Sequence, residues 1–144
     1  MQAKETGCAM CSRWDDDADL RIMEFAHSWL VLNRDQFFPG YCLLLAKQHV
    51  TELFHLDPAI RQGMLEEVSR TAAVLARLFK ADKINYELLG NMVPHIHWHL
   101  VPRHVTDPLW PRPIWAEPHR ECRLSAEEYR ERCAVIRHHL EEAA

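Results

Sequence analysis

Residues 95–101 read HIHWHLV, so three histidines alternate with apolar residues. A period of two is the geometry of a β-strand, whose successive side chains point to opposite faces. We therefore expect His95, His97 and His99 to share one face, with Ile96 and Trp98 facing the core. Three imidazoles on one face do little for folding, because each desolvated ring needs hydrogen-bond partners and titrates near neutral pH. The pattern indicates a strand with a function.

The segments around this stretch predict an α+β fold, in which strands of one sheet are combined with two helices. Five segments have the apolar character of strands: 21–25, 28–33, 41–46, 84–89 and 97–103. Phe38-Pro39-Gly40 is a turn signal, which predicts that 28–33 and 41–46 form an antiparallel hairpin. Asp57-Pro58 predicts the start of a long helix that ends near residue 80, with Asp57 as its N-cap.

That long helix carries a predicted apolar stripe: Ile60, Met64, Leu65, Val68, Val74, Leu75 and Leu78. The pair Ser125 and Glu128 forms a capping-box pattern, which predicts a C-terminal helix to about residue 140. We expect a single domain over residues 1–144. Within it we expect a polar, irregular N-terminal arm over 1–19, a core over 20–105, and a Pro-rich loop with the C-terminal helix over 106–144.

Composition excludes several classes of protein. With 48% hydrophobic and 26% charged residues, the 144-residue chain has the make-up of an ordinary globular domain. Its net charge of -4 argues against stable nucleic-acid binding. No apolar run approaches the length of a membrane span, and the first 19 residues lack a signal-peptide core. Five cysteines, an odd number, favour a reducing cytoplasm over a disulfide framework.

Residues 90–103 resemble the signature of the histidine triad (HIT) proteins, in which three histidines alternate with apolar residues. Blocks at 31–34, 38–41 and 46–49 occur in the order and spacing that this family uses. The chain is most similar to bacterial HIT hydrolases and to hydrolases of dinucleoside polyphosphates such as diadenosine tetraphosphate. The resemblance implies a homodimer, a five-stranded antiparallel sheet in each subunit with a long central helix, and hydrolysis or transfer of nucleotidyl groups at an α-phosphate.

Imidazole chemistry accounts for part of such a reaction. A neutral ring can attack phosphorus without a metal and form a covalent phospho-histidine. The resemblance makes His97 the nucleophile, with the backbone carbonyl of His95 fixing its tautomer. It makes His99 a donor to the phosphate oxygens or to the leaving group, where negative charge grows in the transition state. We therefore predict that His97, His99, His95 and Asn91 form the catalytic set, and that the chemistry needs no cofactor.

Three further positions match residues that contact nucleotide in the family. Asn91 corresponds to an amide near the leaving group, and its alternative role is that of a turn residue after Gly90. Asn33 corresponds to a residue that binds the ribose hydroxyls. Val31 corresponds to a residue of the base pocket, and its alternative role is simple core packing. Met92 occupies the position at which the family has a Ser or Thr that assists the leaving group.

Cys8 and Cys11 have the spacing of two zinc ligands. A zinc site needs two more, and the resemblance supplies His49 and His95. Such a zinc would be structural, because four protein ligands leave no open coordination position. The alternative is a pair of reduced thiols, with His49 as a turn residue or a hydrogen-bond donor near the phosphate.

The leading hypothesis is a nucleotide hydrolase that acts through a covalent intermediate on His97. Its alternatives are a nucleotidyltransferase or phosphorylase of the same superfamily and a nucleotide-binding module without turnover. A loop at 110–115 carries two tryptophans and Arg112. This loop could cover the site or contact polyphosphate through Arg112. Its alternative role is packing, either on the domain itself or on a dimer partner. The remaining histidines and cysteines show no partner pattern.

Overall fold

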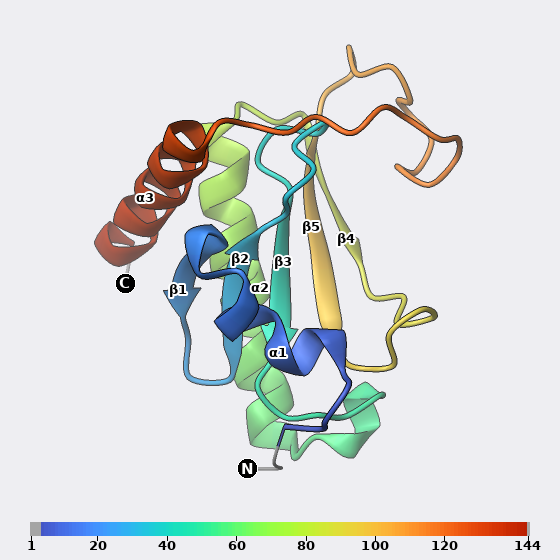
Figure 1. Cartoon of the computed structure of the whole chain (residues 1–144), viewed down its shortest axis with the longest axis vertical. Coiled ribbons are helices and arrows are strands. Elements are labelled where there is room, and N and C mark those ends of the chain that lie inside the picture. The colour runs from blue at the N-terminus through green and yellow to red at the C-terminus, as the bar shows by residue number, and fades with distance from the viewer. Residues whose placement is uncertain (1–3, 144) are drawn as a thin grey trace.

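The computed structural model describes residues 4–143. Its five strands form one antiparallel sheet in the order β1-β2-β3-β5-β4 (Figure 1). The strands are β1 Arg21–Glu24, β2 Ser28–Leu32, β3 Cys42–Ala46, β4 Lys83–Glu87 and β5 His97–Arg103. This architecture, with one long and one C-terminal helix, confirms the predicted α+β class.

The centre of the sheet is buried on both faces, which explains why β2 and β3 are nearly continuous apolar runs. β2 and β3 form the predicted antiparallel hairpin. The turn between them requires glycine, because Gly40 has a φ of 89° and a Cβ there would lie 2.6 Å from the ring of Phe79. On the other side of β3, Leu43 pairs with His99 and Leu45 pairs with His97 of β5.

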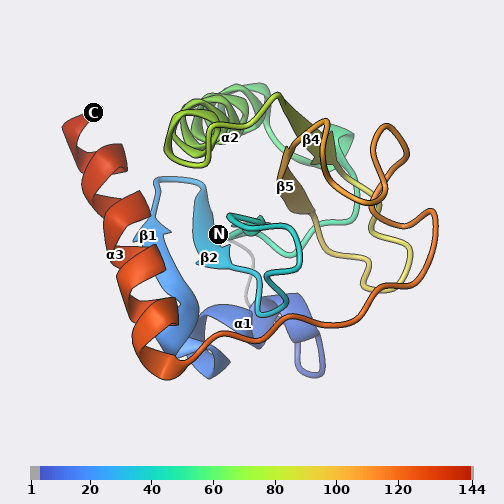
Figure 2. The ribbon, with the colours of Figure 1, turned by 90° about the horizontal axis from the view of Figure 1, so that it is seen from above.

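One face of the sheet is covered by α2 (Pro58–Leu78), and α3 (Ala126–Glu142) packs against α2 and β1 (Figures 1 and 2). The capping box at Ser125 and Glu128 is present as predicted. Asp57 is the N-cap residue as predicted, although its side chain makes no capping hydrogen bond. Pro58 begins the helix all the same, since its fixed φ suits the first helical position.

The predicted apolar stripe of α2 was wrong at Leu65, which is 56% exposed. The buried face of α2 includes Glu67 in place of Leu65. The Glu67 carboxylate accepts hydrogen bonds from the Ser28 hydroxyl at 2.6 Å and from the His27 backbone N–H at 3.1 Å. A carboxylate that receives two donors is tolerated in a helix face that packs against a sheet. Periodicity alone could not reveal this pairing.

The opposite face of the sheet is covered by α1 (Ala9–Asp16) and by irregular loops (Figure 2). The prediction of an irregular arm was therefore wrong over this segment. Its helix forms because the Cys8 sulfur accepts from the Cys11 backbone N–H and Met10 is buried against the sheet. Two short 3₁₀ turns, Ala18–Leu20 and Leu53–His55, complete the regular structure of residues 4–143.

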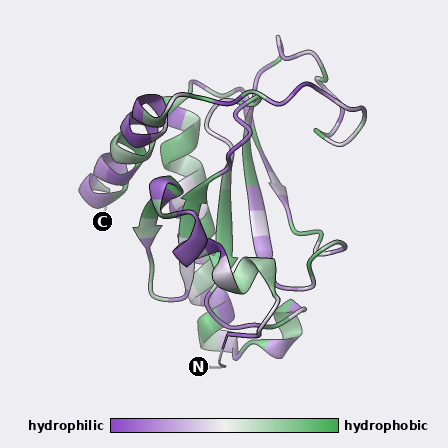
Figure 3. Cartoon of the chain, in the orientation of Figure 1, coloured by the Kyte–Doolittle hydropathy of each residue, from purple (hydrophilic) through white to green (hydrophobic). Residues whose placement is uncertain are grey.

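The two faces of the sheet carry two separate hydrophobic cores. The α2-side core includes Leu30, Leu44 and Leu100, whereas the α1-side core includes Val31, Leu43 and Val101. Figure 3 shows β2 and β3 largely in the hydrophobic colour, while β5 carries hydrophilic segments and α3 is largely hydrophilic. Across residues 4–143, the helices are all too short or too polar to cross a membrane.

Candidate active site and metal cluster

β5 places the histidines as the alternation predicted. His97 and His99 face the α1 side, and Ile96, Trp98 and Leu100 belong to or contact the α2-side core. His95 lies two residues before the strand and is also buried. The rings of His97 and His99 are 5.0 Å apart, centre to centre, so they border one reaction space.

The tautomer of His97 is set by the backbone. Its Nδ1 lies 2.6 Å from the carbonyl oxygen of His95. A carbonyl only accepts, so Nδ1 carries the proton and Nε2 carries a free lone pair on the neutral ring. His97 is only 6% exposed, which limits the number of waters that compete for this lone pair.

His99 is held by Tyr41, whose hydroxyl lies 2.6 Å from Nδ1 of the ring. Burial raises the pKa of Tyr41 far above its usual range, so the phenol keeps its proton. Burial, reinforced by His97, lowers the pKa of His99 to about 4, so this ring is neutral at pH 7. Among the described residues, the phenolic proton has His99 Nδ1 as its acceptor, which leaves the ring proton of His99 on Nε2.

The reaction space therefore contains two rings of opposite polarity. His97 presents a lone pair at Nε2, and His99 presents an N–H at Nε2. One nitrogen can attack an electrophile while the other donates to an oxygen on it. This difference follows from two fixed partners, the His95 carbonyl and the Tyr41 hydroxyl, and it needs no charged histidine.

Trp115 covers the far side of His99. The two rings meet edge to face with centroids 5.5 Å apart. The indole N–H donates to the carboxylate of Glu87, which the register of β4 and β5 places directly opposite His99. The sequence left the role of the 110–115 loop open, and the structure brings one of its tryptophans to His99 of β5.

The loop that carries Trp115 is anchored by a buried ion pair. The Arg103 guanidinium, 1% exposed, contacts both carboxylate oxygens of Asp107 at 2.7 and 3.1 Å and the side chain of Asn85 at 2.8 Å. The guanidinium also packs over the rings of Phe38 and Trp110. A buried bidentate pair of this kind holds the loop in one arrangement.

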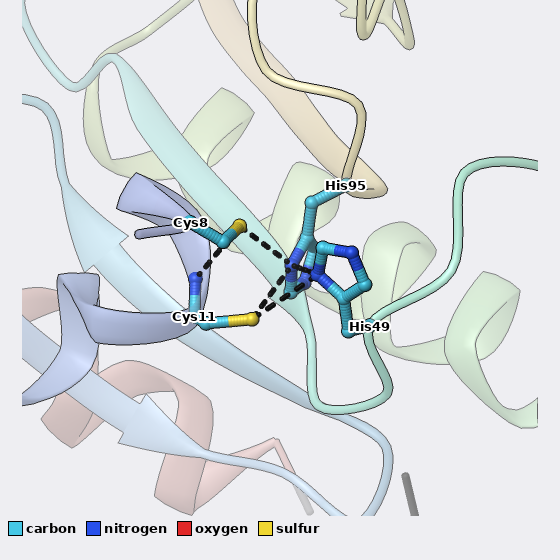
Figure 4. Close-up of side chains that lie close together, drawn as sticks. All are labelled: Cys8, Cys11, His49 and His95. Carbon is cyan, nitrogen blue, oxygen red and sulfur yellow. Dashed lines mark hydrogen bonds between the residues drawn. The ribbon is translucent and has the colours of Figure 1, made fainter. Parts of the chain in front are cut away.

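A second cluster lies beside the first histidine of the triplet, where Cys8, Cys11, His49 and His95 converge (Figure 4). Their four ligand atoms all lie within 4.8 Å of one another. The Nδ1 atoms of the two histidines are 3.2 Å apart, and three sulfur-to-nitrogen distances are 3.2, 3.4 and 3.5 Å. From ordinary zinc bond lengths, the edges of a tetrahedral Cys₂His₂ site are roughly 3.3 Å between nitrogens and about 3.5 Å between sulfur and nitrogen.

The protonation of the two imidazoles also fits a metal. His95 Nε2 lies 2.7 Å from the Ala46 carbonyl and must carry the proton, so Nδ1 presents a lone pair to the cluster. His49 Nε2 contacts the Glu5 carboxylate, which orients its Nδ1 in the same way. Burial lowers the pKa of His95, which favours the neutral ring that binds metals. Ligating histidines are commonly oriented by such outer partners, and these four residues can hold a metal ion.

The remaining predicted residues lie farther from the rings. Asn33 follows β2, and its side-chain amide donates to the Asp35 carbonyl at 3.1 Å. Val31 is fully buried in the α1-side core, where it packs below the site. Asn91 is exposed in the loop between β4 and β5, next to the exposed Met92. Their contacts with nucleotide stay predictions.

Three residues that the sequence did not single out belong to this region: Tyr41, Glu87 and Glu5. Glu87 could have been found from the strand register, because it faces His99 across β4 and β5. Tyr41 follows the Gly40 turn and lies just before β3, so its reach to His99 is a long-range contact that only the sheet reveals. Glu5 carries no sequence signal at all.

Comparison with known proteins agrees with this geometry. A histidine triad protein from Sinorhizobium meliloti 1021 superposes with a TM-score of 0.80 at 28% identity, covering 93% of this chain and 98% of that one. A zinc-bound histidine triad family protein from Mycobacterium smegmatis superposes with a TM-score of 0.68 at 27% identity, covering 95% of each chain.

One curated relative has a named activity. The asymmetrical bis(5'-nucleosyl)-tetraphosphatase of Schizosaccharomyces pombe is 27% identical over 81 residues, which are 53% of this chain and 44% of that protein. The chain thus spans less than half the length of this relative. Residues 16–106 match the sequence model of the HIT domain, which includes the whole sheet and the triplet. The chain belongs to the HIT domain family.

Proposed function

We propose that this protein hydrolyses nucleotides at the α-phosphate, with a dinucleoside polyphosphate or a related nucleotide as substrate. The observation that carries the proposal is the hydrogen bond from His97 Nδ1 to the His95 carbonyl. It leaves a neutral imidazole with its lone pair directed from the strand face into the reaction space. Family membership and the tetraphosphatase relative support a nucleotide-processing enzyme.

In the first step, His97 Nε2 attacks the α-phosphorus. A P–N bond forms and the bond from phosphorus to the leaving oxygen breaks. The Nε2–H of neutral His99 donates a hydrogen bond to that oxygen, which departs as an anion with its negative charge stabilised by this donor. Because burial lowers the pKa of His99 to about 4, the ring is neutral at pH 7 and keeps its Nε2 proton throughout the step.

In the second step, water attacks the same phosphorus and the P–N bond breaks. The products are a nucleoside monophosphate and neutral His97, and the proton lost by the attacking water is released to solvent. Asn91 would contact phosphate oxygens, Asn33 the ribose hydroxyls and Val31 the base. Two in-line displacements at one phosphorus retain its configuration, which distinguishes this route from direct attack by water.

We also propose that the metal of the Cys8, Cys11, His49 and His95 cluster is zinc and that it is structural. The convergence of two sulfurs and two lone-pair nitrogens supports this choice. So does the zinc-bound relative. When bound, zinc would supply tetrahedral coordination that fixes the N-terminal arm. A homodimer, which the family resemblance implies, completes the proposal.

The test of the reaction is His97→Asn with diadenosine tetraphosphate as substrate. The asparagine amide can still donate to the His95 carbonyl, so the fold is preserved while the nucleophile is lost. We expect turnover to fall by at least 10³-fold, in the range of lost nucleophiles. His138→Asn, on the exposed side of α3, is the matched control and should match the wild type. Wild-type turnover in His97→Asn would overturn the proposed intermediate.

A further inference from the structure

Trp115 is an aromatic side chain held in place beside the catalytic rings, yet it is 55% exposed. Its neighbour Ile114 and the nearby Leu109 are buried in the α1-side core. The loop is therefore anchored by other residues, and Trp115 is not required to fill space. A large exposed indole that is fixed by a hydrogen bond costs little further ordering when a ligand packs against it.

The direction of the proposed reaction indicates what this indole would meet. Strand side chains stand roughly perpendicular to the sheet, so His97 attacks from the sheet side. In an in-line displacement the leaving group departs on the side opposite the nucleophile, away from the sheet. Trp115 contacts the ring of His99, which donates a hydrogen bond to the leaving group in the proposed reaction.

The order of the strands separates the leaving group from the transferred nucleotide. The predicted ribose and base contacts, Asn33 and Val31, belong to β2 and its end. Trp115 is tied to Glu87 of β4 at the opposite side of β5. The catalytic strand thus has the nucleotide side on one flank and the indole on the other.

We infer that Trp115 forms a stacking surface for an aromatic leaving group, and that Glu87 sets the angle of its ring. This inference rests on the proposed function and adds a preference among its substrates. An aromatic ring joined to the α-phosphorus through a single oxygen lies within reach of an indole beside His99. Substrates whose leaving group is inorganic gain nothing from Trp115.

The experiment compares two substrates that share the adenylyl group. The p-nitrophenyl ester of AMP has an aromatic leaving group, whereas adenosine 5'-phosphosulfate has an inorganic one. We compare kcat/KM of the wild type, Trp115→Leu and Trp115→Phe. Intrinsic reactivity cancels because each substrate is compared with itself across variants. Trp115→Phe keeps an aromatic face but loses the hydrogen bond to Glu87.

We expect Trp115→Leu to lower kcat/KM for the aryl ester by about 5- to 20-fold, the value of one base-to-aromatic stack. The phosphosulfate should change less than twofold, and Trp115→Phe should recover part of the aryl preference. Equal losses on both substrates, or no loss on either, would overturn the inference and leave the proposed hydrolysis intact. Absence of wild-type turnover on both would instead remove the proposed function.

A second copy of the chain is the competing occupant of this surface. If Trp115 packs on a partner subunit, Trp115→Leu should dissociate the oligomer and lower both activities together. Size-exclusion chromatography with light scattering measures the oligomeric state of each variant. An unchanged state with a selective loss on the aryl ester supports the stacking surface, and dissociation overturns it.

Discussion

Removal of the Tyr41 hydroxyl tests how the polarity of the two catalytic rings is set. In Tyr41→Phe, Nδ1 of His99 loses a buried hydrogen bond of 2.6 Å and the ring loses the partner that fixes its proton on Nε2. A net hydrogen bond contributes about 1 kcal/mol, and a buried acceptor left unpaired costs about 1–3 kcal/mol. We therefore expect the free energy of unfolding to fall by about 1–2 kcal/mol.

The same loss sets the effect on catalysis. Among the described residues, no group in Tyr41→Phe stabilises the tautomer of His99 that is protonated on Nδ1. The loss of activity is therefore limited to the free energy of the lost hydrogen bond. At 1.36 kcal/mol per factor of ten, 1–2 kcal/mol is roughly a 5- to 30-fold decrease in kcat/KM. Nitrogen-15 NMR of the imidazoles should show His99 protonated on Nε2 in the wild type and a mixture of tautomers in Tyr41→Phe.

Tyr86→Phe is the matched control, because Tyr86 lies half-exposed on the edge strand β4. It should keep wild-type activity and the wild-type tautomer of His99. The reasoning is refuted if Tyr41→Phe retains full kcat/KM. It is also refuted if the spectra of the wild type already show the proton of His99 on Nδ1.

Three other perturbations give outcomes set by the structure. Cys11→Ser should bind less than about 0.2 equivalents of zinc by elemental analysis and unfold at a lower temperature, whereas exposed Cys122→Ser should retain the metal. Arg103→Leu leaves the largely buried carboxylate of Asp107 without its partner, so the free energy of unfolding in urea titrations should fall by about 3 kcal/mol. Near-wild-type stability of this variant would argue against an anchoring role for the ion pair. The folded pKa of His99 is about 4, whereas an unfolded histidine titrates near 6.5. The neutral, buried His99 ring therefore contributes its full stability above about pH 6.5, and this contribution is lost as pH falls toward 4. A His99 NMR signal that titrates near 6.5 would contradict this expectation.

Much of the fold could be predicted because its signals are local. The alternation from His97 onward, the Phe38-Pro39-Gly40 turn and the capping box at Ser125 each involve neighbouring residues, and each has its predicted structure. The helix over Ala9–Asp16 was missed because it has only 8 residues and lacks a regular apolar stripe. Its stability comes from tertiary contacts of Met10 and from the cysteine cluster, which the local sequence does not display.

The candidate site could also be predicted only where its signals are local in sequence. The motif identified the residues that carry lone pairs and protons, because their spacing along one strand is itself the signal. The contacts that hold them were not visible, since Tyr41 reaches His99 from 58 residues away in sequence, and only the structure shows which tryptophan of the 110–115 loop meets His99. Such contacts depend on sheet order and loop anchoring, which no pattern of neighbouring residues encodes.

His95 joins β5 to the cluster of Cys8, Cys11 and His49, and this accounts for a histidine at the first position of the triplet. Its ring presents Nδ1 to the cluster and donates from Nε2 to Ala46, so the residue is fixed at both nitrogens. Its backbone carbonyl is thereby held where it accepts the Nδ1 proton of His97. Any rotation of His95 that follows loss of the cluster would move this carbonyl and release the tautomer of His97. We therefore expect a metal bound in this cluster to stabilise the fold and, through the backbone of His95, also the tautomer of the proposed nucleophile.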